Sequence, residues 1–175
     1  MSETLIDALR HQSCYPHAVT TIEVIESDLA WILLTGQFAY KIKKPVDLYF
    51  LDASSLESRH ELCHSEFTLN QRSFSELYID VVGIYHTDAG IQVGQGEGQP
   101  IEYAVKMHQF DPNSTLDQIH NAEGLNHERL EKLCQAVFDL HAKAPVSGIE
   151  MPFGEPNSLY VPAQLNFDQV RPRLK

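Results

Sequence analysis

The stretch that decides the fold is Ala39-Tyr40-Lys41-Ile42-Lys43-Lys44-Pro45-Val46. It sets lysines into an extended apolar segment, where lysine is ordinarily disfavoured, so a specific role is expected for them. Upstream, residues 29–34 predict a buried strand and Thr35-Gly36 predicts a turn. Residues 38–43 then predict the returning strand of a hairpin.

Side chains in a strand alternate between the two faces of a sheet. One face of this second strand is expected to carry Ala39, Lys41 and Lys43. The other face is expected to carry Phe38, Tyr40 and Ile42. A small residue beside cations on one face suits a ligand that carries phosphate groups.

Composition limits the classes of function. With 175 residues, 43% of them hydrophobic, the chain can bury a core as one domain or as one domain with an added subdomain. The net charge of -11 argues against general binding to nucleic acid or to an anionic membrane. The longest apolar run, at residues 29–34, is far shorter than the roughly 20 residues that span a bilayer.

The N-terminal residues lack the basic segment and apolar stretch of a signal peptide. The three cysteines are too widely spaced for a disulfide framework or a C-x-x-C site; they are Cys14, Cys63 and Cys134. We therefore expect a cytoplasmic protein in a reducing setting.

The remaining pattern predicts an α+β fold. Residues 4–11 predict a short helix, residues 21–26 a strand, and residues 46–51 an extension of the hairpin. Ser54 followed by Glu57 has the form of a capping box, which predicts a long helix from there to about Phe74.

Further strands are expected at residues 79–85, 91–93 and 102–109. The result is a twisted, mainly antiparallel sheet of about five strands packed on one long helix. Beyond Asp111-Pro112, residues 114–121 predict a short helix, and Asn126 caps a longer one that reaches Ala142. No periodicity is seen from Pro145 onward.

Glu66 lies on the apolar arc of the long helix. The arc is defined at 100 degrees per residue by Leu56, Leu62, Cys63, Phe67, Leu69 and Phe74. A carboxylate that faces a core requires a cation or strong donors, and Lys41 is the expected partner. Two alternatives are that Glu66 reaches water or bonds Asn70; Arg59 and Asn70 also lie on this arc.

Several runs resemble the aminoglycoside phosphotransferase-like kinase family, in particular bacterial proteins that join such a kinase domain to a P-loop ATPase domain. The runs are Trp31-Ile32-Leu33-Leu34-Thr35-Gly36, Tyr40-Lys41-Ile42-Lys43-Lys44-Pro45-Val46-Asp47, Phe50-Leu51-Asp52, Tyr103-Ala104-Val105-Lys106-Met107 and Asn166-Phe167-Asp168-Gln169. The resemblance implies a protein kinase-like small lobe at residues 1–106. It implies a hinge and the first helices of a truncated large lobe at residues 107–175.

The resemblance also implies site residues. Lys41 would contact the phosphates of ATP, Glu66 would orient Lys41, and Ala39 would lie against the adenine. Lys43 would be a second contact to the phosphates. The hinge, whose backbone would bond the adenine, would include Lys106, Met107, His108 and Phe110. Tyr103-Ala104-Val105-Lys106 also fits the Ala-x-Lys pattern, but only Lys41 precedes a long helix with an inward glutamate.

The chain departs from the family where catalysis is concerned. The His-Gly-Asp loop that supplies the base and the later aspartate that binds magnesium do not appear before Lys175, and no Walker A motif is present. Catalytic residues and magnesium ligands are therefore expected outside this chain, in a missing C-terminal lobe. The resemblance implies a small molecule as the phosphate acceptor, and the residues that select it would lie mostly in the missing lobe. The alternative is a non-catalytic nucleotide-binding or protein-interaction module.

A zinc metallopeptidase is a further alternative, because His60-Glu61-Leu62-Cys63-His64 matches H-E-x-x-H on a predicted helix. Charged neighbours and the lack of a third histidine at the next expected spacings argue against it. We expect a hairpin loop and not a phosphate loop at Gly94, Gly96 and Gly98, since no helix follows them. His141 lies on an apolar helical stripe, so we expect it to be a hydrogen-bonded core histidine.

Overall fold

The computed structural model describes residues 3–48, 50–146, 148 and 155–171. These residues form two compact units, at residues 1–126 and 127–175. The boundary between the units comes after the position expected for the end of a small lobe, residue 106. No helix among the described residues is both long enough and apolar enough to cross a bilayer.

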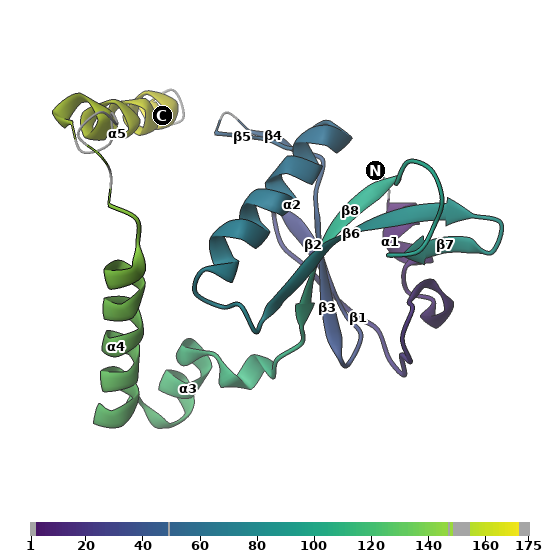
Figure 1. Ribbon diagram of the computed structural model, residues 1–175, viewed down its shortest axis with the longest axis horizontal. Helices are drawn as coiled ribbons and strands as arrows, with labels where there is room; N and C mark the ends of the chain where they lie inside the picture. Colours follow the sequence, from purple (N-terminus) through teal and green to yellow (C-terminus); the bar gives the residue numbers. More distant parts are fainter. Residues whose placement is uncertain (1–2, 49, 147, 149–154, 172–175) are drawn as a thin grey trace. The chain divides into compact units, whose positions relative to one another are not determined.

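The first unit is built on an antiparallel sheet with strand order β1-β2-β3-β8-β6-β7 (Figure 1). Its strands are β1 (Glu23–Glu26), β2 (Ala30–Leu34), β3 (Phe38–Lys43), β6 (Tyr78–Thr87), β7 (Gly90–Val93) and β8 (Glu102–His108). The predicted hairpin is confirmed, since β2 pairs with β3 in a register that places Ile32 opposite Lys41. The extension expected at residues 46–51 is wrong, because β4 (Asp47–Leu48) pairs with β5 (Leu51–Asp52) in a separate two-stranded sheet.

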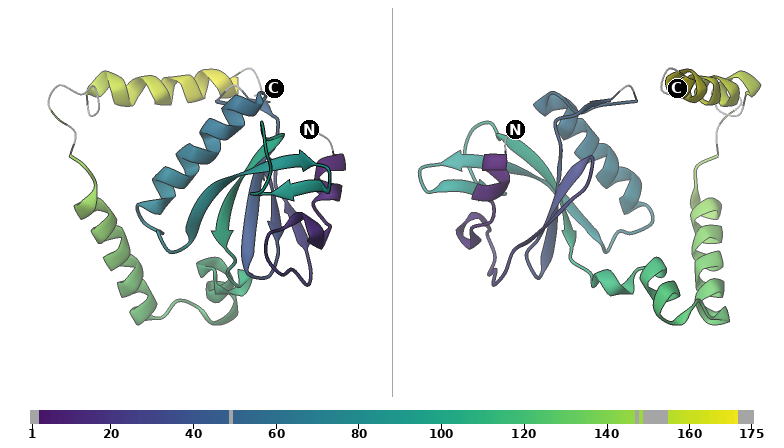
Figure 2. Two further views of the ribbon diagram at one scale, coloured as in Figure 1. Left: turned by 45° about the vertical axis from the view of Figure 1, so that its right-hand side comes forward. Right: turned by 180° about the vertical axis from the view of Figure 1, so that it is seen from behind.

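Helix α2 (Leu56–Gln71) lies across one face of this sheet, against β8 and β6 (Figure 2). A small apolar cluster lies between the helix and this face, made of Cys63 from α2 with Ala39, Val105 and Met107 from the sheet. The opposite face holds the larger core, including Leu33, Tyr40 and Ile42, and is covered by α1 (Glu3–Ala8) and η1 (Gln12–Cys14). The predicted alternation along β3 therefore separates the two layers, with Tyr40 and Ile42 on the core side.

The start of α2 differs from the expectation. Ser55, not Ser54, is the N-cap, and its side chain accepts a hydrogen bond from the amide of Ser58. The hydroxyl and amide of Ser54 instead donate to a carboxylate oxygen of Asp52 in the preceding hairpin. An adjacent acceptor therefore removes Ser54 from the capping box that the sequence suggests.

The chain continues from β8 through η2 (Pro112–Ser114) to α3 (Leu116–Glu123). The second unit contains α4 (His127–Lys143) and α5 (Pro156–Val170). The prediction of α4 is confirmed, but no residue of α4 is buried, so the expectation of a core position for His141 is wrong. Helix α5 was not predicted, because proline inside a helix, here Pro162, is unfavourable.

Candidate functional site

The centre of the candidate site is a glutamate that faces two lysines. The Nζ atom of Lys41 donates to Oε1 of Glu66 at 2.8 Å, and Lys43 donates to the other carboxylate oxygen. Asn70 bonds the main-chain oxygen of Glu66, not its carboxylate. The predicted pairing of Lys41 with Glu66 is therefore confirmed, and Lys43 is a second partner.

Two elements bring these charges together. Lys41 and Lys43 are alternate residues of β3, so both point to the face that α2 covers. Glu66 stands on the sheet-facing side of α2, where Arg59 and Cys63 are the buried residues. The side chains of Lys41, Lys43 and Glu66 are 29%, 17% and 12% exposed, so the cluster is sheltered yet open on the Lys41 side.

The cluster carries one positive charge in excess. Burial acts to raise the pKa of the Glu66 carboxyl, but hydrogen bonds and the charges of the two lysines outweigh it and hold the pKa below its usual value. Glu66 is therefore ionised at neutral pH. Two ammonium groups against one carboxylate leave a net cation that an anionic ligand can neutralise.

A second ion pair lies on the same side of α2, and the sequence did not predict it. The guanidinium of Arg59 reaches the carboxylate of Glu102 at 2.9–3.1 Å. It also donates to the main-chain oxygens of Ala53 and Ser54 at 2.9 and 2.8 Å. Glu102 is completely buried. The position of Arg59 on the apolar arc was the one signal in the sequence that it required a buried partner.

Cys63 lies on α2 between the two ion pairs. It is fully buried, and burial raises the pKa of its thiol to about 12. A thiol with such a pKa stays protonated at neutral pH and is a poor nucleophile. Cys63 is therefore a packing residue of the small apolar cluster.

A pocket of about 410 Å³ opens on the same face of the sheet, beyond Ala39. Its apolar walls come from β1, β2, β3 and the end of β8, and polar side chains of η2 and α3 form its rim. The lining residues are Ile25, Ile32, Leu34, Ala39, Met107, His108, Gln109, Phe110, Pro112, Asn113, Thr115, Asp117 and Gln118. This volume lies within the range of about 300–1,000 Å³ typical of small-molecule sites.

Some of the predicted site residues line this pocket, and others do not. Ala39, Met107, His108 and Phe110 line it. Lys41 lies outside the lining but next to Ala39 on the same face of β3. The side chain of Lys106 lies on the opposite face, with its Nζ atom 4.1 Å from the centre of the Phe38 ring. The order of elements along the chain predicted Lys41, not Lys106, as the partner of the helix glutamate, and Lys41 is the lysine that contacts Glu66.

The expected hinge, residues 106–110, begins inside β8, which ends at His108. The amide of His108 donates to the Leu77 oxygen at 2.9 Å, and that of Gln109 donates to the Gln37 oxygen at 3.1 Å. These two N–H groups are therefore already engaged with main-chain oxygens just outside β3 and β6. The amide of Phe110, the next along the pocket wall, has no backbone hydrogen bond among the described residues.

The rival zinc motif forms a pair on the surface. His60 and His64 place their Nε2 atoms 2.9 Å apart on α2. Within the described part of the chain, no group of three or more His, Cys, Asp or Glu side chains is positioned to hold a metal ion. Peptidase chemistry requires such a third protein ligand, so the geometry gives it no support.

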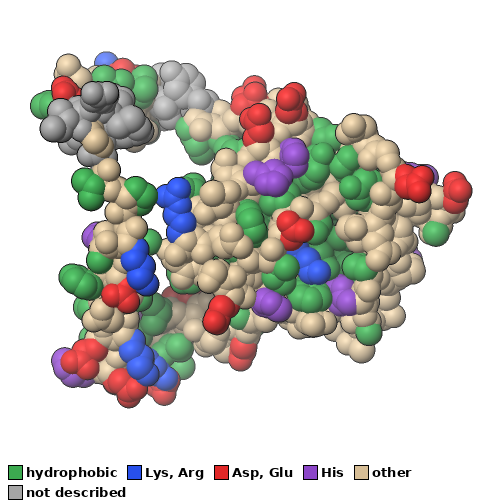
Figure 3. Space-filling model, in the orientation of Figure 1, with side chains coloured by type: hydrophobic (Ala, Val, Ile, Leu, Met, Phe, Trp, Pro, Cys, Tyr) green, Lys and Arg blue, Asp and Glu red, His purple; other side chains and the backbone are tan. Residues whose placement is uncertain are grey.

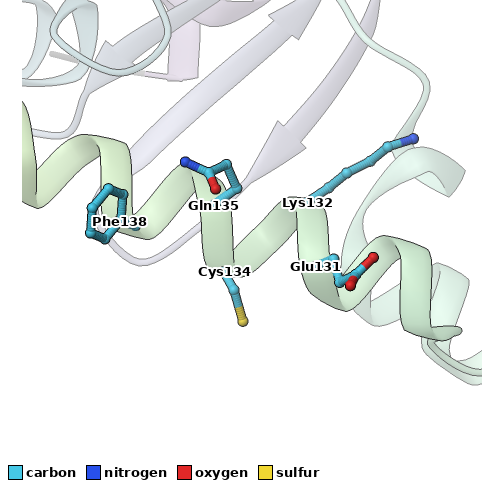
Figure 4. Close-up of a pocket in the computed structure, with 5 residues that line it drawn as sticks. All are labelled: Glu131, Lys132, Cys134, Gln135 and Phe138. Carbon is cyan, nitrogen blue, oxygen red and sulfur yellow. The ribbon is translucent and has the colours of Figure 1, made fainter.

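On the face drawn in Figure 3, the Lys and Arg side chains of the described residues are scattered and form no continuous basic patch. A second hollow lies along α4 and is lined by Glu131, Lys132, Cys134, Gln135 and Phe138. Figure 4 shows these side chains projecting in different directions from the single helix α4, and no other element supplies a described lining residue.

Comparison with known proteins gives relatives without a known function. A stretch of 81 residues is 35% identical to the uncharacterized proteins Rv2004c of Mycobacterium tuberculosis and Mb2027c of Mycobacterium bovis. The match covers 45% of this chain but 16% of each relative, so the chain is similar to a small part of much longer proteins. No protein-family model and no solved structure matches the chain.

Proposed function

We propose that the first unit binds ATP as the nucleotide-binding part of an aminoglycoside phosphotransferase-like small-molecule kinase. In protein kinases a lysine on the third strand pairs with a glutamate of the following helix and holds the nucleotide phosphates. The observation that carries the proposal is the 2.8 Å contact between Lys41 on β3 and Glu66 on α2, beside a pocket of suitable size.

The pocket suits a nucleobase. Ile32, Leu34 and Ala39 on one side and Met107 at the end of β8 offer apolar surface to a flat ring. The amide of Phe110 would donate to a ring nitrogen, because the amides of His108 and Gln109 are engaged elsewhere. A base seated there would direct its phosphates along β3 toward Lys41.

The lysine pair would compensate for a missing loop. Gly36 is the sole glycine before Lys41, so the G-x-G-x-x-G loop with which protein kinases cover the phosphates has no counterpart there. Lys41 and Lys43 together leave one positive charge beyond the Glu66 carboxylate. In this proposal that charge attracts the phosphates, and Glu66 orients Lys41.

ATP binding to the chain of residues 1–175 tests the proposal, with calorimetry as the readout and ATP and adenosine as ligands. Lys41→Ala should weaken ATP binding by about tenfold or more, because a charge-assisted contact is lost. Adenosine affinity should stay unchanged. Lys106→Ala is the matched control, since Lys106 faces away from the pocket. Unchanged ATP affinity in Lys41→Ala, with loss in Lys106→Ala, would contradict the site.

Catalysis in this proposal depends on residues beyond Lys175. The general base and the magnesium carboxylates would lie in a further lobe, and the acceptor would be a small molecule. Sequencing the native reading frame past the codon for Lys175 tests this part. A His-Gly-Asp loop with a later aspartate would support a kinase, whereas a reading frame without them would leave a non-catalytic nucleotide-binding module.

A further inference from the structure

The histidine pair of α2 is not used by the proposed nucleotide site. His60 and His64 are one helical turn apart, and their Nε2 atoms approach to 2.9 Å. The two ring centroids are 4.5 Å apart, with the ring planes inclined at 74°. The facing nitrogens therefore share one proton in the metal-free protein, as donor and acceptor.

The position of His60 is fixed by the sheet. Its ring stacks on Tyr103 of β8, with centroids 3.8 Å apart and the planes 21° from parallel. His64 is exposed to solvent, so its ring can turn. One imidazole is thus held in place while the other adjusts, which reduces the entropy that a bound ion must offset.

We propose that His60 and His64 together bind a divalent transition-metal ion through their Nε2 atoms, with Cu²⁺ preferred. Imidazole nitrogens lie about 2.0–2.1 Å from such ions, so a pair 2.9 Å apart subtends an angle of about 90° at the metal. A right angle is the cis geometry of tetragonal Cu²⁺ or Ni²⁺ sites. Cu²⁺ also stands highest among the divalent first-row ions in affinity for nitrogen ligands, so it should bind more tightly than Ni²⁺ or Zn²⁺.

The chemistry around the pair is compatible with an open site. Neutral imidazole nitrogen is a ligand for Cu²⁺, Ni²⁺ and Zn²⁺. With no third protein ligand placed among the described residues, water completes the coordination sphere.

Titration of the chain with Cu²⁺ in a non-coordinating buffer tests the proposal. One equivalent should bind with an electron paramagnetic resonance spectrum of two nitrogen ligands, and Ni²⁺ and Zn²⁺ should bind more weakly. His64→Ala should lower Cu²⁺ affinity by about tenfold or more and leave one nitrogen ligand. Because His64 is exposed, this variant should keep the far-ultraviolet circular dichroism of the parent.

His127→Ala is the matched control. His127 also has a potential ligand one turn on, with Glu131 at 3.3 Å on α4. Its replacement should leave the tightest Cu²⁺ site unchanged. The proposal is overturned if His64→Ala keeps the parent affinity, if His127→Ala removes the tight site, or if Zn²⁺ binds more tightly than Cu²⁺.

Discussion

Two ion pairs stand on the same side of α2, with Cys63 between them. They differ in their exposure to solvent and in their net charge. Arg59 and Glu102 are 8% and 0% exposed, and each charge is matched. Glu66 is shared by two lysines, of which Lys41 is 29% exposed. The first pair is closed and neutral, whereas the second is open and has a cation in excess.

The difference separates structure from binding. A closed, neutral pair has no capacity left for a ligand, and its satisfied hydrogen bonds tie α2 to the start of β8. An open pair with a spare positive charge can exchange one of its contacts for a phosphate. We therefore expect changes at Arg59 to affect stability and changes at the lysines to affect ligand affinity.

Arg59→Met should have the largest effect on stability. It leaves the carboxylate of Glu102 buried without its cation, which should reduce the free energy of unfolding by about 3–5 kcal/mol. Urea denaturation, followed by the fluorescence of the single tryptophan, Trp31 in β2, measures this change.

The double variant Arg59→Met/Glu102→Leu is the control for that experiment. It removes both charges, so most of the lost free energy of unfolding should return. A cost below about 1 kcal/mol for Arg59→Met alone would mean that Glu102 reaches water and that the comparison drawn between the two pairs is wrong.

Glu66→Gln should have a smaller effect, reducing the free energy of unfolding by about 1–3 kcal/mol at pH 7, because both lysines lose a charged partner. The reduction should depend on pH. The pKa of Glu66 is lowered in the folded protein, so its stabilising effect is complete above the unfolded pKa and is lost as pH falls through the folded pKa.

The gap in stability between the parent and Glu66→Gln should therefore narrow below about pH 4.5. Urea denaturation at pH 7, 5 and 3.5 measures it. A gap that stays constant with pH would show that Glu66 does not titrate differently in the folded and unfolded chains, and the ion pair with the lysines would then contribute little.

The sequence predicted the open pair because both of its signals are local. Lysine in an apolar strand and glutamate on the apolar arc of a helix each break a periodic pattern, and opposite charges that face one core are expected to meet. The pairing of β2 with β3 follows from the turn at Thr35-Gly36 for the same reason.

The closed pair could not be predicted, because its partners are 43 residues apart and Glu102 opens a strand, where alternation does not yet fix a face. Packing decides which residues of α2 lie over which residues of β8, and the hydrophobic periodicity of the helix or of the strand does not. The N-cap was missed for a similar reason. The pattern of Ser54 followed by Glu57 predicted Ser54 as the N-cap, but Ser54 bonds Asp52 of the preceding hairpin and Ser55 caps the helix instead.

Lys43→Met should have the smallest effect and addresses the role of the second cation. Lys41 still pairs with Glu66, and the Met side chain fills the same sheltered space, so the free energy of unfolding should change by less than about 1 kcal/mol. ATP affinity should fall by less than about tenfold, because the charge that is lost acts on the phosphates at a greater distance than Lys41. Calorimetric titration of Lys43→Met and Lys41→Ala side by side measures the difference. A greater loss in Lys43→Met would make Lys43 the main phosphate contact and would reduce Lys41 to the partner that holds Glu66 in place.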